Sequence, residues 1–119
     1  GHKTGDLVLQ EVAAAAFAEL RGPFDRLGRW GGEEFVILLS NVTLEQSALV
    51  CERIRERIAA LHLEARDEAF SVTASFGTCL LKPGAQIDMT LETADAALFQ
   101  SKRTGRNKVT SRRAVELAA

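Results

Sequence analysis

Residues 29–39 read RWGGEEFVILL and place two glycines and two adjacent glutamates directly before an apolar run. Strand-like residues stand on both sides of Gly31 and Gly32. Two glycines between strands favour a two-residue hairpin turn, because both central positions can take positive φ at low steric cost. The stretch therefore predicts a β-hairpin with Glu33 and Glu34 beside its turn.

The spacing of apolar residues on either side of this hairpin predicts three helices and four strands. Apolar residues recur at steps of three and four in the helical segments and alternate in the strand segments. Thr43 and Gln46 have the spacing of a capping box. The expected elements are a helix over 6–21, strands over 26–30 and 34–40, a helix over 43–62, a strand over 70–80, a helix that starts after Asp88 and is closed by Gly105, and a strand over 108–110.

This order of elements indicates an α+β fold. The sheet is expected to be mixed and mainly antiparallel, flanked by helices, in a ferredoxin-like or palm-type arrangement that lacks its first strand. No repeat, linker or low-complexity segment supports a second domain.

Composition and charge exclude several classes of protein. Of 119 residues, 46% are hydrophobic and 26% charged, and the net charge is -1, which argues against a non-specific nucleic-acid binder. No apolar run reaches the roughly 20 residues of a membrane helix. Cys51 and Cys79 are each flanked by apolar residues and lack metal-ligand spacing, which predicts reduced, packed thiols in a cytoplasmic protein without zinc. A membrane anchor elsewhere in the full-length protein stays an open alternative.

Glu33 and Glu34 are the first candidate functional residues. Adjacent residues of a regular strand point to opposite faces, so only local distortion at the glycine turn lets both carboxylates reach one ligand. One interpretation is a solvated hairpin tip. The other is a magnesium and nucleotide site, because bare glycines let a nucleotide approach the backbone and Mg²⁺ takes carboxylate oxygens when it also holds phosphates.

Three further groups of residues carry possible ligand chemistry. Lys102 and Arg106 are four residues apart, so on one helix face they are able to hold two phosphate oxygens, although cations at a helix C-terminus also complement its dipole. Asp6 has the place of a helix N-cap, and a carboxylate there is equally able to accept hydrogen bonds from guanine. A possible cluster of Asp25 with Arg21, Arg53 and nearby Arg26 is explained as well by surface ion pairs.

Several stretches together resemble the landmarks of the GGDEF family of diguanylate cyclases. They stand in the family's order, as GHKTGD at 1–6, RWGGEEF at 29–35, VTASFG at 72–77 and ADAALFQSKRTGRNKV at 94–109. The third position of the family's signature accepts Asp or Glu. The resemblance covers residues 1–109 and implies a single GGDEF domain over 1–119, with a short C-terminal tail over 110–119.

The resemblance implies an activity and a homodimer. The family condenses two GTP molecules into cyclic di-GMP with release of pyrophosphate, and each of two domains holds one GTP. By position, Glu33 is implied to be a metal ligand and the base for the 3'-hydroxyl, with Glu34 as a supporting carboxylate or second metal ligand. Gly31 and Gly32 are implied to lie against the ribose and the α-phosphate.

Other roles follow from the same resemblance. Asp6 is implied to bind guanine, and Lys102 and Arg106 to hold the terminal phosphates. The implied cofactor is Mg²⁺ or Mn²⁺, and the implied partners are GTP, cyclic di-GMP and a regulatory domain upstream, with no nucleic acid and no membrane contact by this domain.

Two departures from the family pattern carry predictions. The family's first strand with a metal-binding Asp, and its FKxxND segment with a guanine-binding Asn, are not in the sequence, so we expect an N-terminally truncated domain that is inactive by itself. Asp25 occupies the Asp place of the product-binding RxxD motif, but Gly22 occupies the Arg place and Arg21 is displaced by one residue. Arg53 matches an additional product-binding arginine. We therefore predict weak or absent product inhibition.

Two other classes of function stay open at this point. One is a non-catalytic domain of the same fold that binds GTP or cyclic di-GMP and regulates a neighbouring domain. The intact GGEEF, Lys102 and Arg106 favour the enzyme, because degenerate members usually lose the signature first. The other is an unrelated α+β interaction domain whose hairpin has this sequence without the chemistry.

Overall fold

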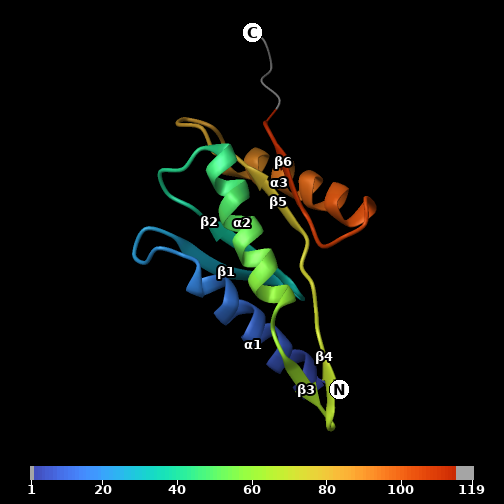
Figure 1. Ribbon diagram of the computed structural model, residues 1–119. Helices are drawn as coiled ribbons and strands as arrows, with labels where there is room; N and C mark the ends of the chain where they lie inside the picture. The colour runs from blue at the N-terminus through green and yellow to red at the C-terminus, as the bar shows by residue number, and fades with distance from the viewer. Residues whose placement is uncertain (1, 115–119) are drawn as a thin grey trace.

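Figure 1 shows the computed structural model of the protein, which describes residues 2–114. Helices and short strands alternate along these residues, and the predicted α+β class is confirmed. The elements are α1 (His2–Ala18), β1 (Arg26–Gly31), β2 (Glu34–Leu38), α2 (Leu44–Ala59), β3 (Leu63–Ala65), β4 (Glu68–Phe70), β5 (Phe76–Cys79), α3 (Ile87–Arg103) and β6 (Val109–Arg112).

The hydrophobic core lies where α1 meets α2. Ala15 and Ala16 of α1 and Ile54 and Ile58 of α2 are all buried. Small alanines let the two helices approach closely, and the isoleucines fill the remaining space. Partly buried side chains from neighbouring segments pack on this cluster, namely Val12, Leu20, Leu27, Ile37, Val50, Leu61, Val72, Ala74 and Phe76.

The strands form three separate two-stranded ladders within the described residues. β1–β2 and β3–β4 are antiparallel, so the mainly antiparallel sheet expected from the sequence is confirmed in two of the three ladders. β5 and β6 pair in parallel, which was not predicted. Because α3 connects them and returns the chain to the starting edge, the two strands run in the same direction.

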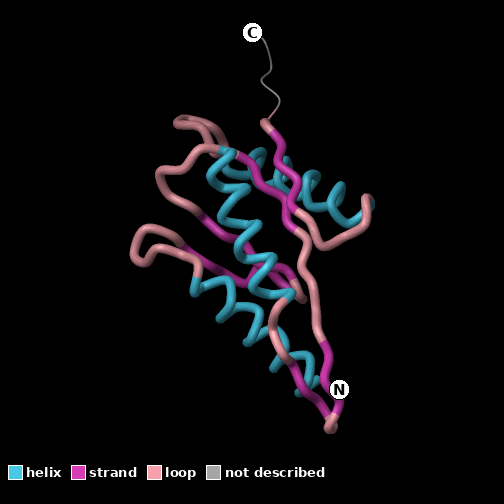
Figure 2. Tube along the Cα trace, in the orientation of Figure 1, coloured by secondary structure: helices cyan, strands magenta, loops and turns pink. Residues whose placement is uncertain are grey.

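The single strand predicted over 70–80 is wrong. β4 ends at Phe70 and β5 begins at Phe76, and Figure 2 shows the intervening segment as a loop. Period-two alternation reports which face of a segment is buried, but a strand also needs a neighbour for its backbone hydrogen bonds. The β3–β4 hairpin was also missed, because its turn residues Arg66 and Asp67 have φ of 52° and 65° and Arg is not a typical turn residue.

The helix boundaries correct two expectations. α1 already includes Gly5 and Asp6, so Asp6 is not an N-cap; a single glycine costs a helix only about 1 kcal/mol and does not stop it. α3 begins at Ile87 with Gln86 as its N-cap, two residues earlier than expected. The capping box of α2 is confirmed, with Thr43 and Gln46 bonded reciprocally.

The helix α3 packs on the β5–β6 ladder at very close range, at the opposite end of the molecule from α1 (Figure 1). Ala97 and Ser101 face the ladder and are completely buried. The Ser101 hydroxyl donates to the Phe76 carbonyl at 2.8 Å and lies 2.6 Å from the Thr110 hydroxyl. One small polar side chain thus joins α3 to both strands, and it fixes the C-terminal turn of α3 relative to the ladder.

Both cysteines are free thiols, as predicted. Burial raises the pKa of the Cys51 thiol to about 12, so this thiol stays protonated and unreactive at neutral pH. None of the helices within residues 2–114 combines the length and the apolar character that crossing a membrane requires.

Candidate functional site

The glycine turn lies one residue later than the sequence predicts. In the β1–β2 register Gly31 pairs with Glu34, so Gly32 and Glu33 are the two turn residues. An irregularity in the ladder between Arg29 and Gly31 leaves Trp30 without an opposite residue, and this bulge moves the turn along the chain. Glu33 therefore belongs to the turn itself, and Glu34 is the first residue of β2.

The backbone beside the two glycines is open. A Cβ atom added at Gly31 or at Gly32 would meet none of the described atoms within 4 Å, so packing does not demand glycine at either place. The backbone conformation does favour glycine at Gly32, because the φ of 55° is in the left-handed region. Arg29 donates from Nε to the Gly32 carbonyl at 2.9 Å and holds the turn in this shape. A ligand is thus able to lie directly against the backbone.

The signature hairpin and the C-terminal turn of α3 meet through an ion pair. Lys102 Nζ lies 3.7 Å from Glu34 Oε1, and both side chains are partly exposed. An exposed pair of this kind contributes at most about 1 kcal/mol to stability. Its importance is positional, because it brings a carboxylate of the signature and a predicted phosphate-binding cation to one place.

Arg106 lies outside the helix that was expected to carry it. α3 ends at Arg103, and Arg106 is in the following loop with φ of 62°. The prediction that Lys102 and Arg106 share a helix face is therefore wrong, because Gly105 ends the helix between them. The Arg106 backbone N–H donates to the Ser101 carbonyl at 2.9 Å, which keeps the loop folded against the helix end. Its side chain is exposed.

Asp6 is exposed on α1. No hydrogen bond or ion pair within residues 2–114 joins it to the signature carboxylates or to the two phosphate-binding candidates. Neighbouring residues of α1 line a small cavity of about 140 Å³, which residues of β3 and β4 also line. A guanine role for Asp6 accordingly stays a prediction.

The carboxylates fit a metal that arrives with its substrate. Within residues 2–114, no three His, Cys, Asp or Glu side chains lie close enough to hold a metal ion by themselves. Glu33 and Glu34 supply hard carboxylate oxygens at one turn. Mg²⁺ keeps several waters and is commonly bound by one or two carboxylates plus substrate phosphates. This donor set therefore fits Mg²⁺ better than a permanently held structural metal.

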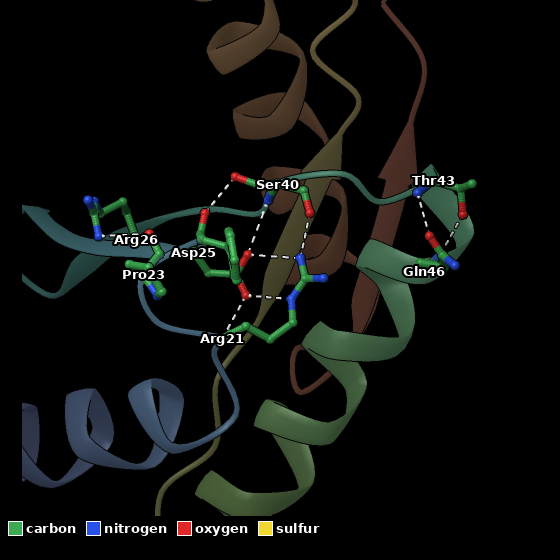
Figure 3. Close-up of polar contacts among 8 residues, drawn as sticks. Arg21, Pro23, Asp25, Arg26, Ser40, Thr43 and Gln46 are labelled. Carbon is green, nitrogen blue, oxygen red and sulfur yellow. Dashed lines mark hydrogen bonds and ion pairs between the residues drawn. The ribbon is translucent and has the colours of Figure 1, made fainter.

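Arg21 and Asp25 form a bidentate ion pair (Figure 3). Arg21 donates from Nε to Asp25 Oδ2 and from Nη2 to Oδ1, each at 3.1 Å. The backbone N–H groups of Arg21 and Ser40 donate to the same carboxylate at 2.8 and 3.1 Å. Arg21 also donates to the Ser40 carbonyl. The buried Asp25 carboxylate thus accepts four hydrogen bonds and ties the loop after α1 to the end of the hairpin.

Arg53 is held elsewhere. Its Nε lies 3.5 Å from Glu19 Oε2, and Arg57 on the next turn of α2 pairs with the same glutamate at 3.1 Å. Arg21 pairs with the buried Asp25, and Arg53 pairs with Glu19, so these contacts are ion pairs but do not unite the three residues in one cluster.

Acid should weaken the fold through Asp25. Hydrogen bonding from the Arg21 side chain lowers the pKa of Asp25 from 3.8 to about 2, against the opposing effect of burial. A carboxyl group whose pKa is lower in the folded state stabilises the fold at pH values above its unfolded-state pKa. This stabilisation is lost as the pH falls from about 4 through about 2. We expect Asp25→Asn to cost about 1–2 kcal/mol at pH 7 and much less at pH 2. Urea unfolding at both pH values measures this difference.

Glu45→Gln is the matched control for that measurement. Glu45 pairs with Arg113 at 3.3 Å, but its side chain is 72% exposed. Its replacement should change stability little at either pH. An Asp25→Asn effect of the same size at pH 7 and pH 2 would contradict the assignment of the acid sensitivity to this carboxylate.

The family of the chain follows from a direct comparison. A family model described as "Diguanylate cyclase, GGDEF domain" matches residues 1–108. The chain belongs to the GGDEF family of diguanylate cyclases. The diguanylate cyclase DgcP of Pseudomonas aeruginosa is 38% identical over 109 residues, and DosC of Escherichia coli K12 is 34% identical over 110; each alignment covers 92% of this chain. The chain spans 16% and 24% of the length of these relatives.

Solved structures agree with this assignment. The diguanylate cyclase SiaD of Pseudomonas aeruginosa, in complex with its activator SiaC, superposes with a TM-score of 0.88 at 44% identity and covers 94% of this chain and 43% of that one. The GGDEF domain of DgcB from Caulobacter crescentus, in complex with c-di-GMP, gives 0.87 at 37% identity, over 93% of this chain and 66% of that one. The expected GGDEF fold is thereby confirmed.

Two contacts of this GGDEF domain were not predicted. The bond from Arg29 to the Gly32 carbonyl has a local signal, because an arginine three residues before a turn glycine is able to reach the glycine carbonyl. The bond from Arg55 to Asn107 joins residues 52 apart in the chain and has no signal in the sequence. Both contacts brace segments that carry predicted site residues.

Proposed function

We propose that this GGDEF domain is catalytic and condenses two GTP molecules into cyclic di-GMP and two pyrophosphates, using Mg²⁺ or Mn²⁺ in a homodimer. The observation that best supports the proposal is the ion pair between Glu34 and Lys102, 3.7 Å apart. It unites the signature carboxylates with a cation suited to phosphate in one partly exposed place. Metal, positioned phosphates and a base are most of what nucleotidyl transfer asks of a protein.

Glu33 acts as the general base in this proposal. Its carboxylate accepts the proton of a GTP 3'-hydroxyl, and the resulting oxygen bonds to the α-phosphorus of the GTP held by the partner domain. The bond from that phosphorus to the pyrophosphate oxygen breaks, and pyrophosphate leaves. Glu33 and Glu34 would hold a divalent cation, which would supply charge neutralisation for the phosphates and lower the pKa of the attacking hydroxyl. Two such transfers, one in each direction, close the ring.

The remaining residues bind and orient the nucleotide. The open backbone at Gly31 and Gly32 accommodates the ribose and the α-phosphate without a side-chain clash. Lys102 and Arg106 hold the terminal phosphates, Lys102 as a point charge and Arg106 as a fork. Asp6 selects guanine by accepting from its N1–H and exocyclic amine.

A strand before Gly1 completes the domain in this proposal. It supplies the family's metal-binding Asp and, in the segment after it, the guanine-binding Asn. The separation of the strands into three two-stranded ladders and the loop between β4 and β5 are consistent with a further strand in the sheet. A regulatory domain upstream then controls dimerisation, in a cytoplasmic GGDEF domain of a longer protein.

Product inhibition through the RxxD place should be weak. The carboxylate of Asp25 already accepts four hydrogen bonds from Arg21 and Ser40, and Arg53 is paired with Glu19. A bound product would have to displace these internal partners before it gains its own. The side chains in this place therefore stabilise the loop after α1 in preference to binding a nucleotide.

Nucleotide-dependent stabilisation tests whether the domain is a GTP site at all. In the full-length protein with Mg²⁺, GTP at 100 times its dissociation constant should stabilise the domain by about 2.7 kcal/mol. ATP at the same concentration is the control. It should stabilise the domain much less, because adenine lacks the adjacent N1–H and 2-amino donors through which a carboxylate selects guanine. Equal stabilisation by both nucleotides, or none by GTP, would contradict the proposal and favour an interaction domain.

A further inference from the structure

The loop between α3 and β6 holds two successive residues in an unusual backbone conformation. Arg106 and Asn107 have φ of 62° and 50°, after Gly105 at 122°. For residues other than glycine, each left-handed position costs about 1 kcal/mol or more and persists only where surrounding contacts hold it. The loop is therefore fixed by specific contacts at a site where an arginine is presented to solvent.

Asn107 is the point where the rest of the fold holds this loop. Its side-chain Oδ1 accepts a hydrogen bond from Arg55 Nη1 at 2.8 Å, and its backbone N–H donates to the Ser75 hydroxyl at 3.1 Å. Arg55 is on α2, and Ser75 immediately precedes β5. Two segments distant in sequence thus clamp the residue directly after Arg106.

The Arg55 side chain that bonds Asn107 is also held by two glutamates of its own helix. Its Nε donates to Glu52 Oε1 at 2.9 Å, its Nη2 contacts the same oxygen, and Glu56 lies 4.0 Å away. Hydrogen bonding to Glu52 also raises the pKa of Arg55, so the guanidinium stays charged. The Arg55 side chain is 19% exposed. A fixed guanidinium loses little conformational freedom when it bonds Asn107.

We infer that Arg55 is a positioning residue for phosphate binding, acting through Asn107 to hold Arg106 in its ligand-ready backbone conformation. The inference rests on the proposed function, in which Arg106 binds the terminal phosphates of GTP. Arg55 itself donates to Asn107 and Glu52, so it acts on the phosphates through the loop. The arrangement makes α2 a determinant of triphosphate affinity in a phosphate site otherwise built from the hairpin, α3 and the loop after α3.

The test compares variants of the full-length protein by calorimetric binding of a non-hydrolysable GTP analogue and of GMP, both with Mg²⁺. Arg55→Met keeps the aliphatic stem and removes the donors. Asn107→Gly removes the acceptor but tolerates the left-handed φ, so the backbone stays unstrained. Each variant is expected to lower the affinity for the GTP analogue about tenfold, which is the scale of one charge-assisted hydrogen bond. Each should leave the affinity for GMP within about twofold of the wild-type value. The double variant should lose no more than either single variant.

Arg57→Met is the matched control, because Arg57 is on the same helix but pairs with Glu19 at 3.1 Å. It should bind both ligands as the wild type does. Arg106→Ala should weaken the GTP analogue at least as much as Arg55→Met. If Arg106→Ala does so and Arg55→Met does not, the positioning role is wrong while the proposed function stands. Equal losses for GMP and the analogue in Arg55→Met would also overturn it. If Arg106→Ala changes nothing, the phosphate role in the proposed function fails as well.

Discussion

Replacing Glu33 with Gln is expected to lower cyclic di-GMP synthesis by about a thousandfold while leaving the fold intact. The amide keeps the size of the side chain, but it neither accepts the proton of the 3'-hydroxyl nor binds a divalent cation as a carboxylate does. Glu33 is an exposed turn residue, and no hydrogen bond or ion pair within residues 2–114 uses its side chain, so the fold loses nothing. Product formation from GTP by the full-length protein measures the effect.

Glu68→Gln serves as the control for this variant. Glu68 begins β4, is exposed, and undergoes the same chemical change away from the signature hairpin. It should retain wild-type synthesis. Substantial synthesis by Glu33→Gln would remove the role assigned to that carboxylate, and a comparable loss in Glu68→Gln would show that the effect is not specific to the site.

The second large effect is expected at Gly77, where β5 touches α3. A Cβ atom at this position would lie 2.2 Å from both the Ala94 carbonyl oxygen and the Leu98 backbone nitrogen. Backbone atoms of a packed helix do not move aside as a flexible side chain does. Gly77→Ala must therefore push α3 away from β5, and we expect it to cost about 3 kcal/mol or more. Urea unfolding of the domain measures the loss.

Gly28→Ala is the control for Gly77→Ala. Gly28 lies in β1, and none of the described atoms is within 4 Å of a Cβ built there. An alanine at this strand position should be neutral or slightly stabilising, because it also restricts the unfolded chain. A Gly77→Ala domain as stable as Gly28→Ala would contradict the close approach of α3 to β5. Displacement of α3 should also weaken GTP binding, since Lys102 is on this helix.

Local chemistry in the sequence predicted the parts of the fold that depend on neighbouring residues. The capping box of α2 and the hairpin of β1 and β2 form from groups a few residues apart, so their signals are in the sequence itself. The strand expected over 70–80 failed because pairing depends on distant segments. The parallel β5–β6 pair and the buried Ser101 were missed for the same reason.

The candidate site divides in the same way. The sequence identified Glu34 and Lys102, and the structure brings them together across 68 residues of chain. The exact turn position at Gly32 was missed, because a bulge at Trp30 shifts the register by one residue. The loop conformation of Arg106 was also missed. The four-residue spacing of Lys102 and Arg106 suggested one helix face, but the helix ends before Gly105.

The product balance of the full-length protein incubated with GTP and Mg²⁺ tests the proposed activity most directly. We expect GTP to be consumed with the appearance of one cyclic di-GMP and two pyrophosphates for every two GTP molecules, and we expect EDTA to stop the reaction. GTP that binds and stabilises the domain but is recovered unchanged, at protein concentrations where the dimer forms, would contradict catalysis and identify a regulatory nucleotide-binding domain instead.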